Sequence, residues 1–171
     1  MENSVNKPFF IQDENVAQYA QLMASWIAQQ VKSAGRQGLV LGMSGGIDCS
    51  VVACLCRLAQ VDVHLVMMPY GSDMNNSKSH QHAMELIQKF DFPFHVFDIQ
   101  SAVDALAIHQ EQFVAEATAA NRALSLANIR PRVRMTYLYQ FAQLGSRFVI
   151  GTGNMACLLY TSPSPRDGLL S

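Results

Sequence analysis

The chain contains 171 residues, of which 50% are hydrophobic and 15% are charged. This composition predicts a single globular domain with a substantial core, and it excludes a chain that is disordered along most of its length. The 12 lysines and arginines nearly balance the 13 aspartates and glutamates, so the net charge is −1. We therefore expect no general basic surface for nucleic acid or for an anionic membrane, and any anion must be bound locally.

The N-terminus, MENSVNKPFFIQDEN, has no basic segment followed by an apolar one, so no secretory signal is predicted. No uninterrupted apolar stretch approaches the roughly 20 residues of a membrane-spanning helix. The four cysteines show neither a CxxC pair nor the spread of a disulfide framework. Cys54 and Cys56 would point about 200° apart on a helix and could not easily share a metal. These features predict a cytoplasmic protein with reduced thiols and no membrane contact.

Helix and strand patterns alternate along the chain. Apolar residues spaced by three and four predict a helix over residues 13–34, ended by Gly35 and Gly38, and an apolar run then predicts a buried strand at 39–43. Asp48 is expected to cap the next helix. Its apolar face would contain Val51, Val52, Leu55, Leu58 and Ala59.

The remaining pattern continues this alternation. It predicts a strand at 61–68, a helix at 77–90, a strand at 94–99, one or two helices within 101–120, a helix at 128–144 and a strand at 147–150. Strands separated by helices of this length predict an α/β fold, with a doubly wound, mostly parallel sheet and helices on both faces.

The segment GMSGGIDCS, residues 42–50, lies between a predicted strand and a predicted helix. Its glycines allow the backbone to approach a ligand closely, and the helix N-terminus offers N–H groups and a positive dipole end to phosphate. Ser44 adds a hydroxyl donor, and Asp48 would hold a Mg²⁺ ion that also binds the phosphates. A tight turn in which Asp48 only caps the helix is the alternative. The lack of GxxxxGK[ST] excludes a Walker-type loop, and the lack of GxGxxG counts against a Rossmann dinucleotide site.

Three arginines and two histidines are further candidates for site residues. On a helix Arg130 and Arg134 share a face while Arg132 points elsewhere, so the three cannot all serve one ligand. We expect Arg130 and Arg134 to be solvated. His80 and His82 would point to different sides of a helix, so no metal site is expected there.

Ser44-Gly45-Gly46-Ile47-Asp48 resembles the SGGxDS pyrophosphate loop of the N-type ATP pyrophosphatases, which cleave ATP between its α- and β-phosphates. Two later segments, NIRPRVRM at 128–135 and VIGTGNMA at 149–156, resemble the corresponding segments of NAD synthetase. Three motifs in the same order are more specific than one. The resemblance covers residues 10–156 and implies the adenine nucleotide alpha hydrolase-like fold.

The resemblance also implies roles for particular residues. Thr152 would contact ATP, Arg132 would contact deamido-NAD, and Asp48 would bind Mg²⁺. The ATP loop would consist of Gly42, Met43, Ser44, Gly45, Gly46, Ile47, Asp48 and Cys49. The exit of the second strand would offer adenine an apolar wall, made of Met67, Met68 and Pro69.

The activity implied is the ATP-dependent amidation of deamido-NAD to NAD, with AMP and pyrophosphate as the other products. No glutaminase domain precedes the loop, so free ammonia is the expected nitrogen donor. A homodimer is implied by the resemblance alone. Two alternatives stay open: another pyrophosphate-loop amide ligase, similar to GMP synthetase, and an ATP-binding fragment without catalysis.

Two positions depart from the family pattern. Cys49 replaces a serine of the loop, and Cys157 replaces a glutamate that binds Mg²⁺ in the family. The resemblance ends there, and residues 157–171, CLLYTSPSPRDGLLS, differ in composition from the rest. We therefore predict that residues 1–156 are an incomplete ATP pyrophosphatase-type domain and that residues 157–171 are a non-native tail.

Overall fold

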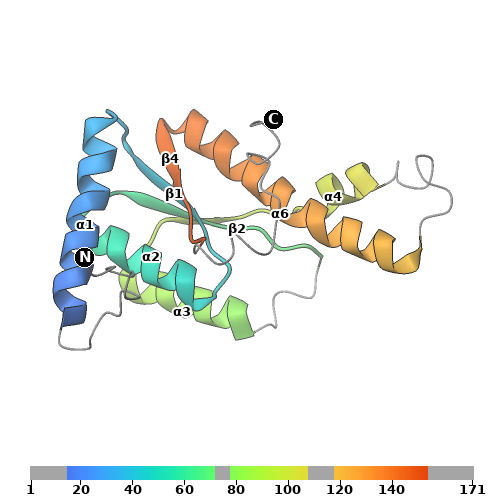
Figure 1. Cartoon of the computed structure of the whole chain (residues 1–171), viewed down its shortest axis with the longest axis horizontal. Coiled ribbons are helices and arrows are strands. Elements are labelled where there is room, and N and C mark those ends of the chain that lie inside the picture. The colour runs from blue at the N-terminus through green and yellow to red at the C-terminus, as the bar shows by residue number, and fades with distance from the viewer. Residues whose placement is uncertain (1–14, 72–77, 108–117, 154–171) are drawn as a thin grey trace, which may run out of the picture.

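The computed structural model describes residues 15–71, 78–107 and 118–153. Within them, four parallel strands form one sheet in the order β3-β2-β1-β4, and helices cover both of its faces (Figure 1). The elements are α1 (Val16–Ser33), β1 (Gly38–Gly42), α2 (Ile47–Leu58), β2 (Val63–Met67), α3 (Lys78–Phe90), β3 (Phe94–Val96), α4 (Gln100–Ala107), α6 (Ala119–Leu144) and β4 (Arg147–Ile150). The predicted α/β fold with a doubly wound parallel sheet is confirmed.

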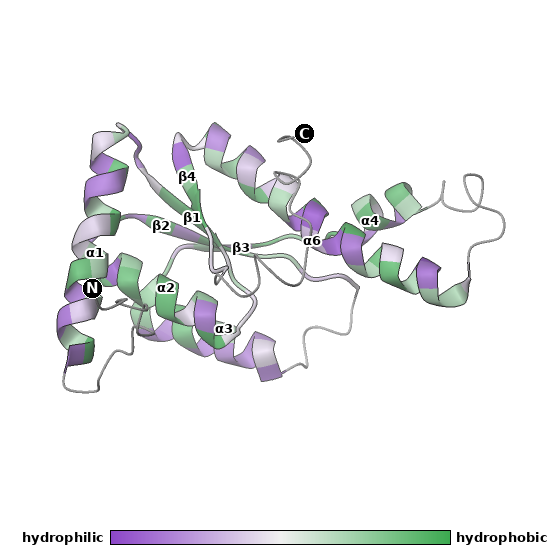
Figure 2. Cartoon of the chain, in the orientation of Figure 1, coloured by the Kyte–Doolittle hydropathy of each residue, from purple (hydrophilic) through white to green (hydrophobic). Residues whose placement is uncertain are grey.

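Alternate residues of the central strands enter two separate cores. Leu39 and Leu41 of β1 pack with α1, α2 and α3, whereas Val40 packs with α4 and α6. In β2, Leu65 enters the first core and Val66 the second, and none of these five side chains is more than 4% exposed. Successive side chains of a strand point to opposite faces, so a sheet covered on both sides needs uninterrupted apolar runs. Figure 2 shows hydrophobic strands between helices that carry hydrophilic residues on their outer surfaces.

One expectation for α2 is wrong, and a second is only partly confirmed. Gly46 is the N-cap residue, and Asp48 lies inside the first helical turn without capping it. Of the predicted apolar face, Leu55 is buried and Val52 and Ala59 pack against the first core, but Val51 and Leu58 are 48% and 45% exposed. The buried face consists of Cys49, Ala53, Leu55 and Cys56. Small side chains at positions 49, 53 and 56 follow one helical stripe, which lets α2 approach the sheet closely.

Helix α6 begins earlier than predicted. The expected start was residue 128, but the helix starts at Ala119, where the Thr118 hydroxyl accepts a hydrogen bond from the Asn121 N–H at 3.2 Å. It then continues through Pro131, a residue that removes one backbone hydrogen bond. Packing of Val133 and Ala142 against the second core offsets that loss. The part of the predicted helices at 108–117 lies outside the described residues.

Strand β3 is shorter than the predicted 94–99. It lies at the sheet edge and ends at Val96, although the Phe97 and Ile99 N–H groups still bond the Met67 and Pro69 carbonyls, both at 2.9 Å. Ile99 is fully buried in the second core. The apolar run that extended the prediction therefore contains core residues beyond the regular ladder.

Three of the four cysteines lie in the described part of the chain. Cys49, Cys54 and Cys56 form no disulfide. Cys56 is fully buried, and burial raises the pKa of its thiol to about 11, which disfavours the nucleophilic thiolate at neutral pH. None of the described helices is long and apolar enough to cross a membrane.

A charged cluster joins β2 and β4 at the amino end of the sheet. The Arg147 Nη2 lies 2.6 Å from Asp62 Oδ2, and His64 Nε2 lies 3.7 Å from Asp62 Oδ1. The His95 ring on β3 is 5.8 Å from the His64 ring. Burial lowers the pKa of His64. Coulombic interactions with Arg147 and His95 lower this pKa further, whereas the interaction with Asp62 raises it. The folded state therefore favours the neutral imidazole.

This cluster predicts a pH-dependent stability. Because the pKa of His64 is lower in the folded state, its contribution is present above about pH 6.5 and is lost as the pH falls below that value. A His64→Gln variant should show a smaller decrease in the free energy of unfolding between pH 7 and pH 5, measured by urea titration. A His82→Gln variant, which removes an exposed imidazole from α3, is the control. Equal pH dependence in wild type and His64→Gln would contradict the assignment.

Candidate functional site

The strand order places two predicted motifs side by side. The chain leaves β1 toward β2 on one side, and returns to pair β4 with β1 on the other side. Leu41 of β1 lies opposite Ile150 of β4, so residues 42–49 and 151–153 emerge together at the carboxyl end of the sheet. Ligands of open α/β sheets bind at such a reversal of strand order. The reversal brings together the predicted ATP loop and Thr152, which are about a hundred residues apart in sequence.

Gly45 sets the path of the loop. Its φ is +80°, a left-handed conformation, and a Cβ built on it would overlap the backbone carbonyl of Ser79 at the start of α3. The Gly46 N–H donates to the Ser44 hydroxyl at 3.2 Å. Only glycine combines this φ with this close approach, so the first glycine of the pair is required by geometry.

The side chains of Cys49 and Ser50 bond the loop itself. The Cys49 Sγ lies 3.3 Å from Ser44 Oγ and donates to the Gly46 carbonyl at 3.1 Å, and the Ser50 hydroxyl donates to the same carbonyl at 2.9 Å. Cys49 is buried. The thiol at this position therefore stabilises the turn from inside. The Ser50 hydroxyl also stabilises the turn through its hydrogen bond to the Gly46 carbonyl.

Backbone N–H groups remain at the mouth of the loop. The first intrahelical bond of α2 runs from the Ser50 N–H to the Gly46 carbonyl at 3.2 Å, so the N–H groups of residues 47–49 precede it. Together with the helix dipole they form a site suited to a phosphate group.

Asp48 is exposed on the first turn of α2, beside these N–H groups. In the described residues it forms no ion pair, and no group of three or more His, Cys, Asp or Glu side chains gathers into a metal site. Mg²⁺ in nucleotide sites takes one or two carboxylates, with phosphates and water completing its shell. One free carboxylate beside a phosphate loop fits that pattern, but a closed protein cage does not exist here.

The arginines of α6 divide as the helical spacing predicted. Arg132 is exposed, and its Nη1 donates to the Asn128 carbonyl at 2.7 Å. Arg130 and Arg134 share the opposite, inward face. The expectation that these two are solvated is wrong: Arg134 Nε donates to the Met68 carbonyl at 2.9 Å, and the Arg130 guanidinium lies 3.9 Å from the centre of the Tyr70 ring.

The predicted adenine wall is only partly accessible. Met67 and Met68 are 2% and 6% exposed because they belong to the two cores, so Pro69 alone of the three is outside the core. Thr152 is exposed directly after β4.

The contacts that sequence reasoning missed are those of Tyr70 with Arg130 and with Asp104 (hydroxyl to Oδ1, 3.0 Å). These pairs are dozens of residues apart in sequence, and no local pattern indicates them.

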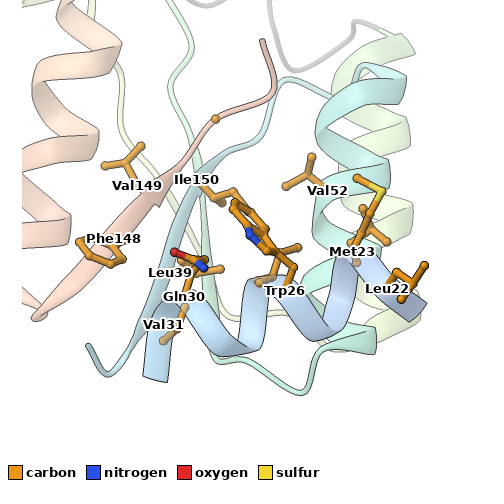
Figure 3. Close-up of a pocket in the computed structure, with 13 residues that line it drawn as sticks. Leu22, Met23, Trp26, Gln30, Val31, Leu39, Val52, Phe148, Val149 and Ile150 are labelled. Carbon is orange, nitrogen blue, oxygen red and sulfur yellow. The ribbon is translucent and has the colours of Figure 1, made fainter. Parts of the chain in front are cut away.

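A cavity of about 680 Å³ lies between α1, α2, β1 and β4 (Figure 3). Trp26 and Ile150 contribute to its walls, and Gln30 is one of its few polar residues. Phosphates and carboxylates need donors that this lining lacks. This cavity is therefore poorly suited to a phosphate or a carboxylate.

Comparison with known families agrees with this geometry. A family model described as NAD synthase matches residues 19–160. The chain belongs to the NAD synthase family. The family match favours NAD synthase over the GMP synthetase-like alternative.

Individual relatives and solved structures extend the comparison. The NH(3)-dependent NAD(+) synthetase of Campylobacter jejuni subsp. jejuni is 34% identical over 138 residues, which are 80% of this chain and 52% of that protein. The solved NH3-dependent NAD synthetase of the same species is 33% identical, with a TM-score of 0.73, over 84% of this chain and 58% of that one. NMN synthetase of Francisella tularensis is 30% identical, with a TM-score of 0.69, over 82% of this chain and 55% of that one. The chain spans about half the length of the curated relatives it matches.

Proposed function

We propose that this chain carries the ATP-binding part of an ammonia-dependent NAD synthetase, which forms NAD from deamido-NAD and ammonia and converts ATP to AMP and pyrophosphate. The observation that carries the proposal is the loop at residues 42–49, located where the strand order reverses in a chain of the NAD synthase family. The ammonia donor is favoured by the names of the relatives.

The loop supports the first chemical step of this reaction. The nicotinate carboxylate attacks the α-phosphorus of ATP, an acyl adenylate forms, and pyrophosphate leaves. Negative charge then increases on the leaving pyrophosphate, and the N–H groups of residues 47–49 with the α2 dipole stabilise it. Asp48 would hold Mg²⁺, which when bound neutralises part of the phosphate charge.

Substrate contacts of Arg132 and Thr152 belong to the same proposal. Thr152 lies next to the loop across the β1–β4 pair, which suits an ATP contact. Arg132 presents its remaining guanidinium donors to solvent beyond the Asn128 carbonyl, which suits a carboxylate or phosphate of deamido-NAD. In the second step ammonia attacks the acyl carbon of the adenylate, the amide forms and AMP leaves.

The homodimer and the cytoplasmic location also remain proposals. Exposed apolar residues on α6, namely Leu124, Met135 and Tyr139, support a subunit interface on that helix. Sedimentation measurements on the purified chain give its mass in solution. The predicted tail, with Cys157, lies outside the described residues and stays a prediction.

Binding and turnover measured on one preparation test the proposed function. We expect calorimetry to detect ATP binding in the presence of Mg²⁺. A coupled assay then follows NAD formation from deamido-NAD and ammonium, with nicotinate mononucleotide as a second substrate because one solved relative is an NMN synthetase. ATP binding without turnover identifies the non-catalytic fragment. A folded chain that binds no ATP contradicts the proposal.

A further inference from the structure

Two arginines on the inward face of α6 lie without an anionic partner. Arg130 stacks on Tyr70, and Arg134 bonds the Met68 carbonyl. Among the described residues, neither guanidinium forms an ion pair with a carboxylate. Asp104 is engaged by the Tyr70 hydroxyl at 3.0 Å. Two positive charges are therefore held one helical turn apart with no negative charge bound directly to either.

The position of Arg130 is costly unless an acceptor binds it. Its Nε is buried and has no hydrogen-bond partner among the residues that the structure describes. Burial lowers the pKa of Arg134, and the neighbouring charge of Arg130 lowers it further, so the two cations destabilise each other. Buried polar groups in native proteins normally have partners, and unfavourable charge arrangements cluster at binding sites. An anion bound by the guanidinium of Arg130 would offset the repulsion between the two cations.

The geometry of Arg130 suits a phosphoryl group. A guanidinium that stacks on an aromatic ring uses its face and keeps the N–H groups along its edge for other partners. Those N–H groups form a planar fork that binds two oxygens of one phosphate. Tyr70 in turn is held by Asp104, which fixes the platform under the guanidinium.

The arginines lie at the same end of the sheet as the ATP loop. A Cβ on Gly42, the first loop residue, would lie 3.1 Å from Leu138 Cδ1 of α6 and 3.8 Å from Met68 Cε. Arg134 is one turn before Leu138 on α6, and Arg130 is two turns before it, about 12 Å along the axis. A nucleotide that starts at the loop and crosses the end of β2 therefore reaches Arg130.

We propose that Arg130, with Arg134 beside it, binds a phosphoryl group of a nucleotide substrate across the carboxyl end of β2. This inference rests on the proposed function, since that function supplies the nucleotide. It assigns to the inward face of α6 a ligand contact that is separate from Arg132 on the outward face. ATP and deamido-NAD both carry phosphoryl groups, and titration with each distinguishes the source.

The test is calorimetric titration of the full chain with Mg²⁺-ATP and, separately, with deamido-NAD. An Arg130→Gln variant should bind one of the two ligands about tenfold more weakly, the loss expected for one charge-assisted contact. Arg130→Lys keeps the charge without the planar fork and should recover part of the affinity. Arg57→Gln is the matched control, because it removes one exposed arginine from the last turn of α2 and should leave both affinities unchanged.

A structural role for Arg130 predicts a different result. If Arg130 only packs on Tyr70, Arg130→Gln lowers the melting temperature and leaves both affinities equal to those of wild type, which overturns the inference. Retained ATP binding in that variant leaves the proposed function intact. A wild-type chain that binds neither nucleotide refutes the function and this inference together.

A measurement on the wild type does not depend on variants that fold. Phenylglyoxal labels accessible arginines, and mass spectrometry of the digested protein gives the rate at each one. One of the two nucleotides, Mg²⁺-ATP or deamido-NAD, should slow labelling of Arg130 several-fold and leave labelling of Arg57 unchanged. Equal protection of both arginines, or of neither, overturns the inference.

Discussion

A Gly45→Ala variant is expected to lose ATP binding and to decrease the free energy of unfolding by about 2 kcal/mol or more. Gly45 has a φ of +80°, and a methyl group there would overlap the Ser79 carbonyl. Both penalties apply at once, because the loop cannot change φ without moving and cannot move without displacing α3. Calorimetry with Mg²⁺-ATP and urea unfolding of the same preparation measure the two effects.

Two other glycines separate these penalties. Gly35 has a φ of +61° with nothing within 4 Å of a built Cβ, so Gly35→Ala should cost only the backbone term, roughly 1 kcal/mol. Gly46 has no positive φ, and its Cβ would lie 3.4 Å from Ser44 Oγ, an ordinary contact. Gly46→Ala should therefore keep most of the ATP affinity. Equal losses in Gly45→Ala and Gly46→Ala would show that the contact with Ser79 is not the cause.

An Asp48→Asn variant is expected to abolish the dependence of ATP binding on Mg²⁺. Asp48 is exposed next to the phosphate loop, and among the described residues it has no ion pair to lose. We expect the affinity measured with Mg²⁺ to fall at least tenfold, to the affinity measured with EDTA. The free energy of unfolding should change by less than about 1 kcal/mol, because only the interaction of Asp48 with the α2 dipole is removed.

The control for this variant is Glu85→Gln, which removes one exposed carboxylate from α3. It makes the same charge change away from the loop and should leave the effect of Mg²⁺ on ATP binding unchanged. If Asp48→Asn retains the full response to Mg²⁺, Asp48 is not the metal ligand.

The helices and strands were largely predictable because their patterns are local. The run Leu39-Val40-Leu41 is apolar throughout and is bounded by glycines, which is typical of a strand buried on both faces. The errors in the prediction arose where contacts with distant segments determine which residues are buried and where a helix begins. Small residues, not the larger Val51 and Leu58, face the sheet from α2, and Pro131 is tolerated because α6 packs along the second core.

The features of the candidate site were also predictable where they depend on local spacing, and were not predictable where they depend on distant packing partners. The opposite directions of Arg132 and Arg134 followed from helical spacing, but the carbonyl and aromatic ring that receive Arg134 and Arg130 lie about sixty residues earlier in the chain. Sequence spacing specifies which side chains share a face of α6, but not which surface that face meets. Solvation of the two arginines was therefore the wrong expectation.

By itself the sequence determined the α/β class, the glycine-containing loop after the first strand and the family to which the chain belongs, because each depends on short ordered motifs and local periodicity. Only the tertiary structure decided which strands are neighbours and which of the segments that follow them lie close together. The order β3-β2-β1-β4 places Thr152 beside the loop, and the packing of α6 over the end of β2 leaves two arginines facing inward without a counter-ion among the described residues. These contacts depend on the pairing of strands and the packing of helices that are distant in sequence. Helical and strand periodicities describe only neighbouring residues, so they do not encode such contacts.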